Sequence, residues 1–478
     1  MNSLKTTLKQ IVQPILALLM LFLIWLIPSS SYQFIGLDII QQRVLMIFIL
    51  ALFLWVTEII PGWVTSISIT TLLLLTVSDN SLSIFKLGSG NGQIMSSTEI
   101  ISSFADPIIF LFIGGFVIAA VATKFSIDKT IVNLVIRFIG VKSKWFLLGI
   151  MAVTVLCSMF ISNTATAIMM LAIISPMLKQ LDENDKGRTA LVLGVAAAAN
   201  FGGLGTPIGT PPNAIVLKYL NDPSGLNLDI SFFDWMVLFL PITILLVFIS
   251  WIILINVFPF KYKELKSVSA ISTEGDNHPK VLRYIVYIIL LITVLMWCLD
   301  RLFGVNANVV AFIPICMFSL LGIFNRKDLS EIDWSVLWLV AGGFALGLAF
   351  QETGLAYKLI SSINFSAINP LVVMITCWLI SWGLSNVISN TASATLIAPI
   401  FITLAISIAP EIVKYGGPKM LMLGVALFTS LAMVLPISTP PNALIYSTGY
   451  INKKHMQYFG LIMGAVGFVM AISCILFL

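Results

Sequence analysis

Long apolar runs separated by short polar connections extend along the whole chain. The first run, 11–28, follows two lysines and precedes no small-residue cleavage site, so we interpret it as a membrane span and not as a signal peptide. At roughly 20 residues per crossing, the pattern indicates about eleven transmembrane helices and two re-entrant hairpins. The predicted fold class is therefore an all-α polytopic membrane protein.

Two of the apolar runs are too long for a single straight helix. Residues 145–178 hold no charged side chain, and 34 residues at about 1.5 Å each exceed the thickness of the hydrocarbon core. The tetrad Ser-Asn-Thr-Ala lies in the middle of this run, at 162–165, and basic residues flank both ends. We therefore predict a hairpin that enters the membrane, turns at the tetrad and returns. The same tetrad at 389–392 predicts a second hairpin over 363–410.

The segment Thr-Pro-Pro-Asn follows each tetrad about fifty residues later, at 210–213 and 439–442. Proline lacks a backbone N–H and interrupts the hydrogen-bond ladder of a helix. We therefore predict two broken helices, over 189–217 and 420–446, whose freed carbonyl groups can bind a cation.

The chain also matches itself at a nearly constant spacing. The offset is 227 residues between Asp106 and Asp333, 228 between the two Gly-Gly-Phe segments, 227 between the tetrads and 229 between the Thr-Pro-Pro-Asn segments. This constancy predicts a duplication. The basic residues around the hairpins predict that the two copies are inverted in the membrane. The predicted parts are a first repeat (1–260) with an interfacial amphipathic helix (125–140), a cytoplasmic linker (261–280) and a second repeat (281–478).

Composition and charge agree with a membrane protein. Of the 478 residues, 59% are hydrophobic and only 10% are charged, and the mean hydropathy is +1.04. In the predicted topology, 19 Lys and Arg residues lie on the cytoplasmic side and 7 on the other, together the 26 of the chain. This asymmetry places the N-terminus inside. The formal charge of +5 thus reflects orientation, and it gives no reason to expect a nucleic-acid partner.

The tetrads supply hydrogen-bond donors at a depth where lipid offers none. A backbone turn persists there only where it lines a protein cavity, and helix N-termini favour anions. We expect Asn163 and Thr164 to bind one carboxylate and Asn390 and Thr391 to bind another. A site of this kind suits a dicarboxylate.

A second serine precedes the serine of each tetrad by four residues: Ser158 precedes Ser162, and Ser385 precedes Ser389. Because residues at i and i+4 share a helix face, we expect each pair to direct its oxygens to one place. Hydroxyl, amide and carbonyl oxygens are suitable ligands for a hard cation such as sodium.

Charge supplies the argument for ion coupling. No Asp, Glu, Lys or Arg occurs in 145–178, 189–217, 359–410 or 420–452. A dianion in this site would meet no fixed cation, and desolvating it unpaired would be prohibitively costly. We therefore expect cations to enter with the substrate.

Other polar and small residues have plainer interpretations. Glu58, Asp106 and Asp333 allow a proton-carrier role, but all three lie near predicted span ends, where acidic residues cap helices or face water. The paired glycines at 114–115 and 342–343 indicate close helix packing. A single Ser-Asn-Thr segment is more often a packing patch than a ligand site, but its duplication favours binding.

These motifs resemble those of the divalent anion/sodium symporter family, which carries dicarboxylates, citrate and sulfate. The resemblance extends from Trp-Val-Thr-Glu at 55–58 to the second Thr-Pro-Pro-Asn segment. It implies a homodimer of eleven-span protomers, each with a scaffold domain and a transport domain that moves like an elevator.

The resemblance also implies the residues of the site. One sodium site would use Ser158, Ser162, Asn163 and backbone near Gly209, and the other Ser385, the backbone of Ile388, Asn390 and backbone near Ser438. The implied substrate contacts are Asn163, Thr164, Thr210, Asn390, Thr391, Thr439 and Pro440. At the position of Ser385, threonine is common in the family.

The resulting hypothesis is a sodium-coupled importer of C4 dicarboxylates such as succinate, malate or fumarate, carrying two or more sodium ions. The alternatives are a sodium-independent dicarboxylate exchanger and a symporter that prefers citrate or sulfate. We expect no enzyme, because the sequence shows no catalytic or metal cluster at the midplane. The expected location is the cell (cytoplasmic) membrane, multi-pass, with the N-terminus in the cytoplasm.

Overall fold

A computed structural model describes residues 36–86, 92–127, 130, 142–264, 279–363, 365 and 368–477. Within these residues the regular structure is helical, apart from two isolated β-bridges. Eight helices in this part of the chain are long and apolar enough to cross a membrane. The predicted all-α polytopic membrane fold is therefore confirmed. The predicted span 11–28 and most of the predicted interfacial helix and linker lie outside the described residues.

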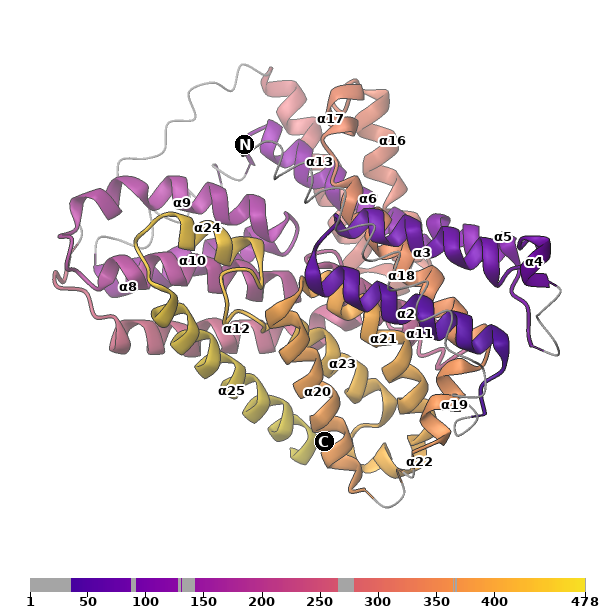
Figure 1. Ribbon diagram of the computed structural model, residues 1–478. Coiled ribbons are helices and arrows are strands. Elements are labelled where there is room, and N and C mark those ends of the chain that lie inside the picture. The colour runs from indigo at the N-terminus through magenta and orange to yellow at the C-terminus, as the bar shows by residue number, and fades with distance from the viewer. Residues whose placement is uncertain are drawn as a thin grey trace, which may run out of the picture.

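The first predicted hairpin consists of two helices joined by a short break (Figure 1). These are α8 (Ser143–Ser158) and α9 (Asn163–Gln180), and both pack against α10 (Gly187–Leu204). After a second break the chain continues as α11 (Pro211–Asn221), with Pro at the first helical positions, where its missing N–H does no harm.

The second predicted hairpin has the same plan. Its helices are α20 (Pro370–Val387) and α21 (Asn390–Ser407), and both pack against α23 (Gly417–Ser430). The following break ends at α24 (Pro440–Ser447), which again begins with proline. The predicted helix interruptions at the tetrads and at the Thr-Pro-Pro-Asn segments are therefore present.

Each broken helix crosses to the opposite hairpin after its break. Helix α11 packs against α21 and α23, and α24 packs against α9 and α10. The two sets of helices are thus interlocked into one bundle, which brings segments more than two hundred residues apart into contact (Figure 1).

The remaining long helices surround this bundle. Asp106 and Asp333 cap two of them, because their carboxylates accept hydrogen bonds from the backbone N–H groups of Ile108 (3.0 Å) and Val336 (3.3 Å). This confirms the predicted capping role of the two aspartates. The helices outside the interlocked bundle are α2 (Ile39–Thr57), α3 (Gly62–Thr76), α6 (Pro107–Lys124), α12 (Phe232–Val257), α13 (Lys280–Cys298), α16 (Phe312–Leu320), α18 (Trp334–Glu352) and α25 (Lys453–Phe477).

The paired glycines lie where helices approach closely, as predicted. A Cβ atom on Gly114 would lie 2.7 Å from the Ala311 side chain, and one on Gly342 would clash with Ser66 of α3. Helix α18 thereby packs against α3 on one side and α21 on the other. It connects the surrounding helices to the second hairpin.

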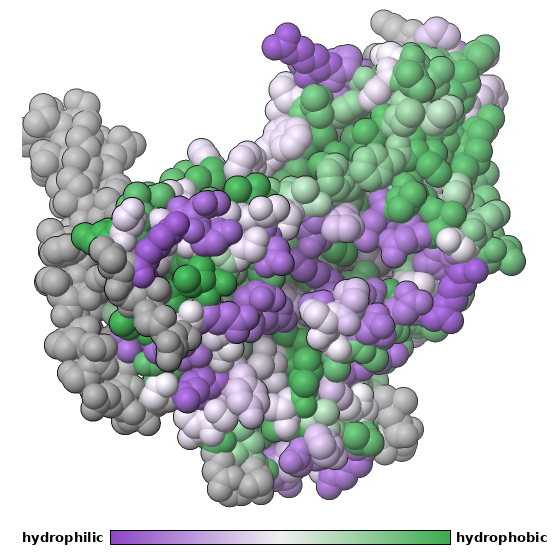
Figure 2. All heavy atoms as spheres, turned by 90° about the vertical axis from the view of Figure 1, so that its right-hand side faces the viewer, coloured by the Kyte–Doolittle hydropathy of each residue, from purple (hydrophilic) through white to green (hydrophobic). Residues whose placement is uncertain are grey.

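The molecular surface is consistent with a lipid environment. On α12 and α13, large apolar side chains such as Ile244 and Leu291, each 59% exposed, point away from the protein. Figure 2 shows hydrophobic areas above a band of hydrophilic residues that crosses the middle of one face. Such apolar surface is stable where it contacts acyl chains.

Candidate functional site

The first tip is the break between α8 and α9. Ser162 caps α9, because its hydroxyl accepts a hydrogen bond from the Ala165 N–H at 3.2 Å. Ser158, the last residue of α8, is fully buried, and its hydroxyl lies 2.6 Å from Asn163 Oδ1 and 2.7 Å from the Ala199 carbonyl oxygen. A hydroxyl has one proton. When the Ala199 carbonyl accepts it, two oxygens with free lone pairs face each other and form part of a ligand set for a cation.

The break between α10 and α11 packs against this tip. A Cβ atom on Gly203 would lie 2.8 Å from Asn163 Oδ1, so the tip approaches the α10 backbone too closely for a side chain. Asn213, from the Thr-Pro-Pro-Asn segment, donates to the carbonyls of Gly203 and Thr206, both at 2.8 Å. The Thr206 hydroxyl donates to the Met159 carbonyl. Asn213 therefore donates hydrogen bonds to some of the carbonyl groups that the break leaves without helical partners.

The second tip has the same cap but different internal bonding. The Ser389 hydroxyl accepts a hydrogen bond from the Ala392 N–H at 3.2 Å. Ser385 is fully buried, and Asn390 is half-buried. Neither Ser385 Oγ nor Asn390 Oδ1, both shielded from solvent, has a hydrogen-bond partner among the residues that the structure describes. Unpaired oxygens of this kind fit a site whose ligand is a cation.

The second break, between α23 and α24, also contacts its tip. Asn442 donates to the carbonyls of Met433 (3.0 Å) and Leu435 (3.2 Å), in the same way as Asn213 in the first break. The Val434 N–H donates to Asn386 Oδ1 at 2.8 Å, which ties the break to the end of α20.

One buried asparagine joins the two halves. Asn200 on α10 is 2% exposed, and its Nδ2 lies 3.2 Å from Thr439 Oγ1 and 3.4 Å from Asn442 Oδ1. It follows Ala199, whose carbonyl accepts from Ser158 of the first tip. The first tip and the second break therefore share one turn of α10.

The predicted site residues differ in their exposure. Asn163, Thr164, Asn390 and Thr391 are half-buried, Thr210 and Thr439 are buried, and Pro440 is exposed. Among the predicted sodium ligands, Ser158, Gly209, Ser385, Ile388 and Ser438 are buried, whereas Ser162 is exposed. The structure gathers the first tip with the first break and the second tip with the second break.

The expectation that each serine pair shares one helix face is wrong. Helix α8 ends at Ser158, whereas Ser162 caps the next helix. Ser385 and Ser389 likewise lie on opposite sides of the break between α20 and α21. The break lies between the two serines of each pair, so helical periodicity does not apply across it. The partner of Ser158 is Asn163 instead.

Sequence reasoning missed several polar residues of the site. Asn200 carries no repeat signal, because the residue 229 positions later is Thr429, whose hydroxyl bonds within its own helix. Thr166 and Ser393, in contrast, lie at the constant offset of 227 and extend both tetrads to Ser-Asn-Thr-Ala-Thr/Ser-Ala. A longer motif comparison would have found this pair.

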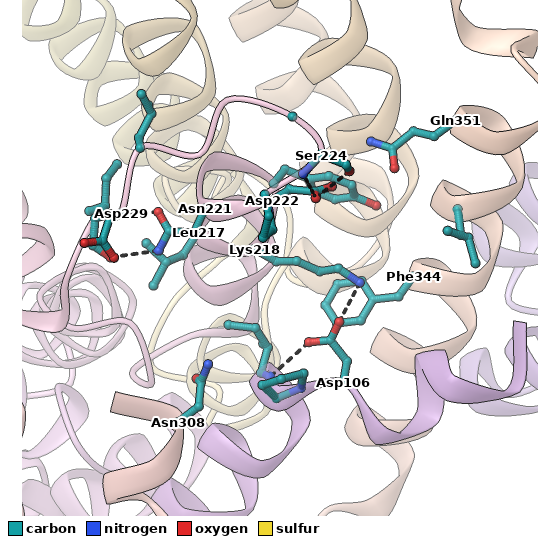
Figure 3. A pocket seen from close by; sticks show the side chains of 18 of the residues that line it. Asp106, Leu217, Lys218, Asn221, Asp222, Ser224, Asp229, Asn308, Phe344 and Gln351 are labelled. Atoms are coloured by element: carbon teal, nitrogen blue, oxygen red, sulfur yellow. Dashed lines mark hydrogen bonds and ion pairs between the residues drawn. The ribbon is translucent and has the colours of Figure 1, made fainter. Parts of the chain in front are cut away.

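A separate pocket of about 1500 Å³ lies near the end of α11 (Figure 3). The predicted site residues are not among those that line it. Lys218 extends into it, with its Nζ 2.7 Å from Asp106 Oδ2 and 3.6 Å from the centre of the Phe344 ring. This ion pair joins α11 of the interlocked bundle to the start of α6. The sequence did not predict that Lys218 is the partner of Asp106.

The fold and the site together define a class of protein: a helical membrane transporter with polar breaks inside long uncharged runs of sequence. Residues 52–415 match the model of the family described as Citrate transporter (CitMHS). The chain therefore belongs to this transporter family, and the family resemblance of its motifs is confirmed.

Several curated proteins are similar to the chain over most of its length. The sodium-dependent dicarboxylate transporter SdcS of Staphylococcus saprophyticus is 30% identical over 90% of this chain and 86% of its own. An uncharacterized transporter of Schizosaccharomyces pombe is 28% identical over 87% of this chain, which spans 47% of that relative. The inorganic phosphate transporter PHO87 of Saccharomyces cerevisiae is 29% identical over 71% of this chain and 36% of its own.

A solved structure shares the fold. The crystal structure of the Alcanivorax borkumensis YdaH transporter, which revealed an unusual topology, superimposes with a TM-score of 0.55. The match covers 78% of this chain and 86% of that chain at 14% sequence identity. This likeness concerns the fold alone.

Proposed function

We propose that this protein is a secondary active transporter that imports C4 dicarboxylates together with sodium ions. The observation that carries the proposal is the pair of oxygen-rich tips, which lie within the uncharged runs 145–178 and 359–410. A dianion bound there needs mobile cations, because no fixed cation compensates its desolvation. The similarity to relatives named sodium-dependent dicarboxylate transporters supports the same coupling.

The proposed roles divide each tip between anion and cation. The amide and hydroxyl donors of Asn163, Thr164, Asn390 and Thr391 bind the two carboxylates, with Thr210, Thr439 and Pro440 lining the site. Two or more sodium ions bind at Ser158, Ser162, Asn163 and Gly209, and at Ser385, Ile388, Asn390 and Ser438. The unpaired oxygens of Ser385 and Asn390 support a cation in the second half-site.

The proposed architecture is an inverted repeat that moves as an elevator within a homodimer, in the cell membrane, with the N-terminus in the cytoplasm. Equivalent bonds in the two halves support the duplication, since Asn213 and Asn442 donate to carbonyls at the equivalent positions Thr206 and Leu435. The interlocking of both hairpins with both broken helices supports their movement as one unit.

The proposal is tested by counterflow in proteoliposomes. Purified protein is reconstituted with internal cold succinate, and uptake of labelled succinate is measured with sodium or choline outside. We expect saturable uptake that requires sodium and is competed by malate and fumarate. Uptake that is equal in choline would exclude symport and favour the exchanger. Citrate, sulfate and inorganic phosphate are tested as competitors, phosphate because one relative is named for it.

A further inference from the structure

Thr166 and Ser393 occupy matching positions one turn into the helices that follow the two tips. They are 227 residues apart, the same offset as the tetrads. Both are fully buried, at 0% exposure. Within the described part of the chain, neither Thr166 Oγ1 nor Ser393 Oγ has a hydrogen-bond partner. We refer to this pair as the matched hydroxyls.

Two other buried hydroxyls in the same hairpins behave differently, whereas Ser385 and Thr395 of the second hairpin also lack a partner among the described residues. Thr154 of α8 donates to the Ile150 carbonyl at 2.7 Å, and Ser381 of α20 donates to the Cys377 carbonyl at 2.8 Å. Both are also 0% exposed. Bonding to the preceding turn is the usual way to satisfy a hydroxyl in an apolar helix. The matched hydroxyls lack this bond, and an unpaired buried hydroxyl is unfavourable unless a ligand completes it.

The matched hydroxyls lie on the helix faces that carry the tip asparagines. Thr166 follows Asn163 by three residues on α9, and Ser393 follows Asn390 by three on α21. Residues with this spacing are neighbours on a helix surface, with Cβ atoms roughly 5–6 Å apart. Asn163 contacts Ser158 and the Gly203 region of the first break. Thr166 is therefore a neighbour of Asn163 on the side of α9 that meets the first break.

We propose that the matched hydroxyls are additional sodium ligands, one in each half-site. This inference rests on the proposed sodium coupling and assigns the cation a ligand from inside each tip helix. A neutral hydroxyl oxygen suits a hard cation. While its lone pairs bind sodium, its proton can be donated to the carbonyl of the preceding turn. The Ser162 carbonyl already accepts a hydrogen bond from the Thr166 N–H at 3.0 Å, and the Ser389 carbonyl accepts one from the Ser393 N–H at 2.9 Å. Each carbonyl can accept a second hydrogen bond.

The test removes each hydroxyl while keeping the side-chain volume nearly constant. The variants are Thr166→Val and Ser393→Ala, and the controls are Thr154→Val and Ser381→Ala, which have the same burial in the same hairpins. The full-length protein is reconstituted, and succinate uptake is measured against sodium concentration. Thermal unfolding of each variant is followed in choline and in sodium.

We expect opposite signatures for variants and controls. Thr166→Val and Ser393→Ala each raise the sodium concentration for half-maximal uptake by roughly tenfold, the effect of losing a ligand group worth about 1.4 kcal/mol. Their melting temperatures in choline stay equal to or above wild type, because an unpaired hydroxyl has been removed. The controls lower the melting temperature and leave the sodium dependence unchanged. Thr166→Ser and Ser393→Thr, which keep a hydroxyl at each position, retain wild-type sodium dependence.

The outcomes separate this inference from the proposed function. Wild-type uptake without sodium dependence would overturn the proposed coupling and with it the basis of the inference. Sodium-dependent wild-type uptake with unchanged sodium affinity in both variants would overturn the inference alone. Loss of stability in choline equal to that of the controls would also contradict it, since the hydroxyls would then be satisfied within the fold.

Discussion

The two tips share a sequence and a cap, but their buried oxygens are satisfied differently. In the first tip, Ser158 is bonded to Asn163 and to the backbone of α10. In the second, the corresponding oxygens of Ser385 and Asn390 have no partner in the described residues. A buried polar group without a partner costs roughly 1–3 kcal/mol. The second half-site therefore holds more unsatisfied polar groups than the first, and a cation bound there would relieve more of this cost.

This difference teaches that sequence identity at a site does not ensure equal energetics. The first tip rests on α10, which offers the Ala199 carbonyl to Ser158. The equivalent position of α23 is Phe428, whose ring stacks on that of Trp378 in α20 with the ring centroids 5.5 Å apart. The environment of each copy thus decides how many oxygens remain for a ligand.

The largest effect is expected from the tip asparagines. Asn163→Ala and Asn390→Ala should each reduce sodium-dependent uptake by at least about a hundredfold, since each removes a carboxylate donor and a cation ligand, or two interactions of about 1.4 kcal/mol. Only Asn163→Ala should also lower the melting temperature in choline, because the Ser158 hydroxyl loses its hydrogen bond to Asn163 Oδ1. Uptake assays and thermal unfolding of both variants measure this. Equal loss of stability in the two would refute the difference between the tips.

The next largest effect is expected from substitution of Asn200, which should lower the stability of the protein. Asn200→Ala removes two hydrogen bonds between the halves and should destabilise the protein by about 1–3 kcal/mol. Thr429→Val is the control, since Thr429 occupies the equivalent position but bonds only within its own helix. Thermal unfolding compares the two variants. A smaller effect of Asn200→Ala than of Thr429→Val would show that the bridge between halves contributes little.

The serines before the tips sharpen the comparison further. Ser158→Ala should lower the stability in choline by about 1 kcal/mol, because it removes the hydrogen bond from the serine hydroxyl to the Ala199 carbonyl. Ser385→Ala should be neutral or slightly stabilising, because its hydroxyl has no bond to lose among the described residues. Thermal unfolding without sodium measures both. A larger loss of stability in Ser385→Ala than in Ser158→Ala would contradict the difference between the two tips.

The smallest effect is expected outside the half-sites, at the pair of Lys218 and Asp106. Asp106→Asn removes the charge but keeps a capping side chain, so it isolates the ion pair. The pair is partly exposed, and its contribution is about 0–1 kcal/mol. The initial uptake rate should change by at most severalfold, with recovery in Asp106→Lys combined with Lys218→Asp.

The matched control for this pair lies in the second repeat. Asp333 caps α18 in the same way, but the position equivalent to Lys218 is Ser447. Asp333→Asn should therefore leave the uptake rate unchanged. An equal effect of the two asparagine variants would assign the change to capping and not to the ion pair.

The sequence predicted the elements of the fold because its signals are local. Uncharged runs, prolines and repeated tetrads located the hairpin helices and the breaks to within several residues. The bonding within the site depends on tertiary contact and was not predictable. Nothing in the sequence places Asn200 beside Thr439, or Lys218 beside Asp106, because these contacts arise only when α10, α11 and α24 cross between the halves.

Asn200 also limits the motions available to the protein. Its two bonds run from α10 to the start of α24, and all three residues are buried. A rocking motion that separated the halves would break these bonds and leave the polar groups unpaired in every cycle. A motion that carried both tips across together would preserve them. The amide thus fits the proposed elevator movement, in which the cargo would stay enclosed between the same two tips from one side of the membrane to the other.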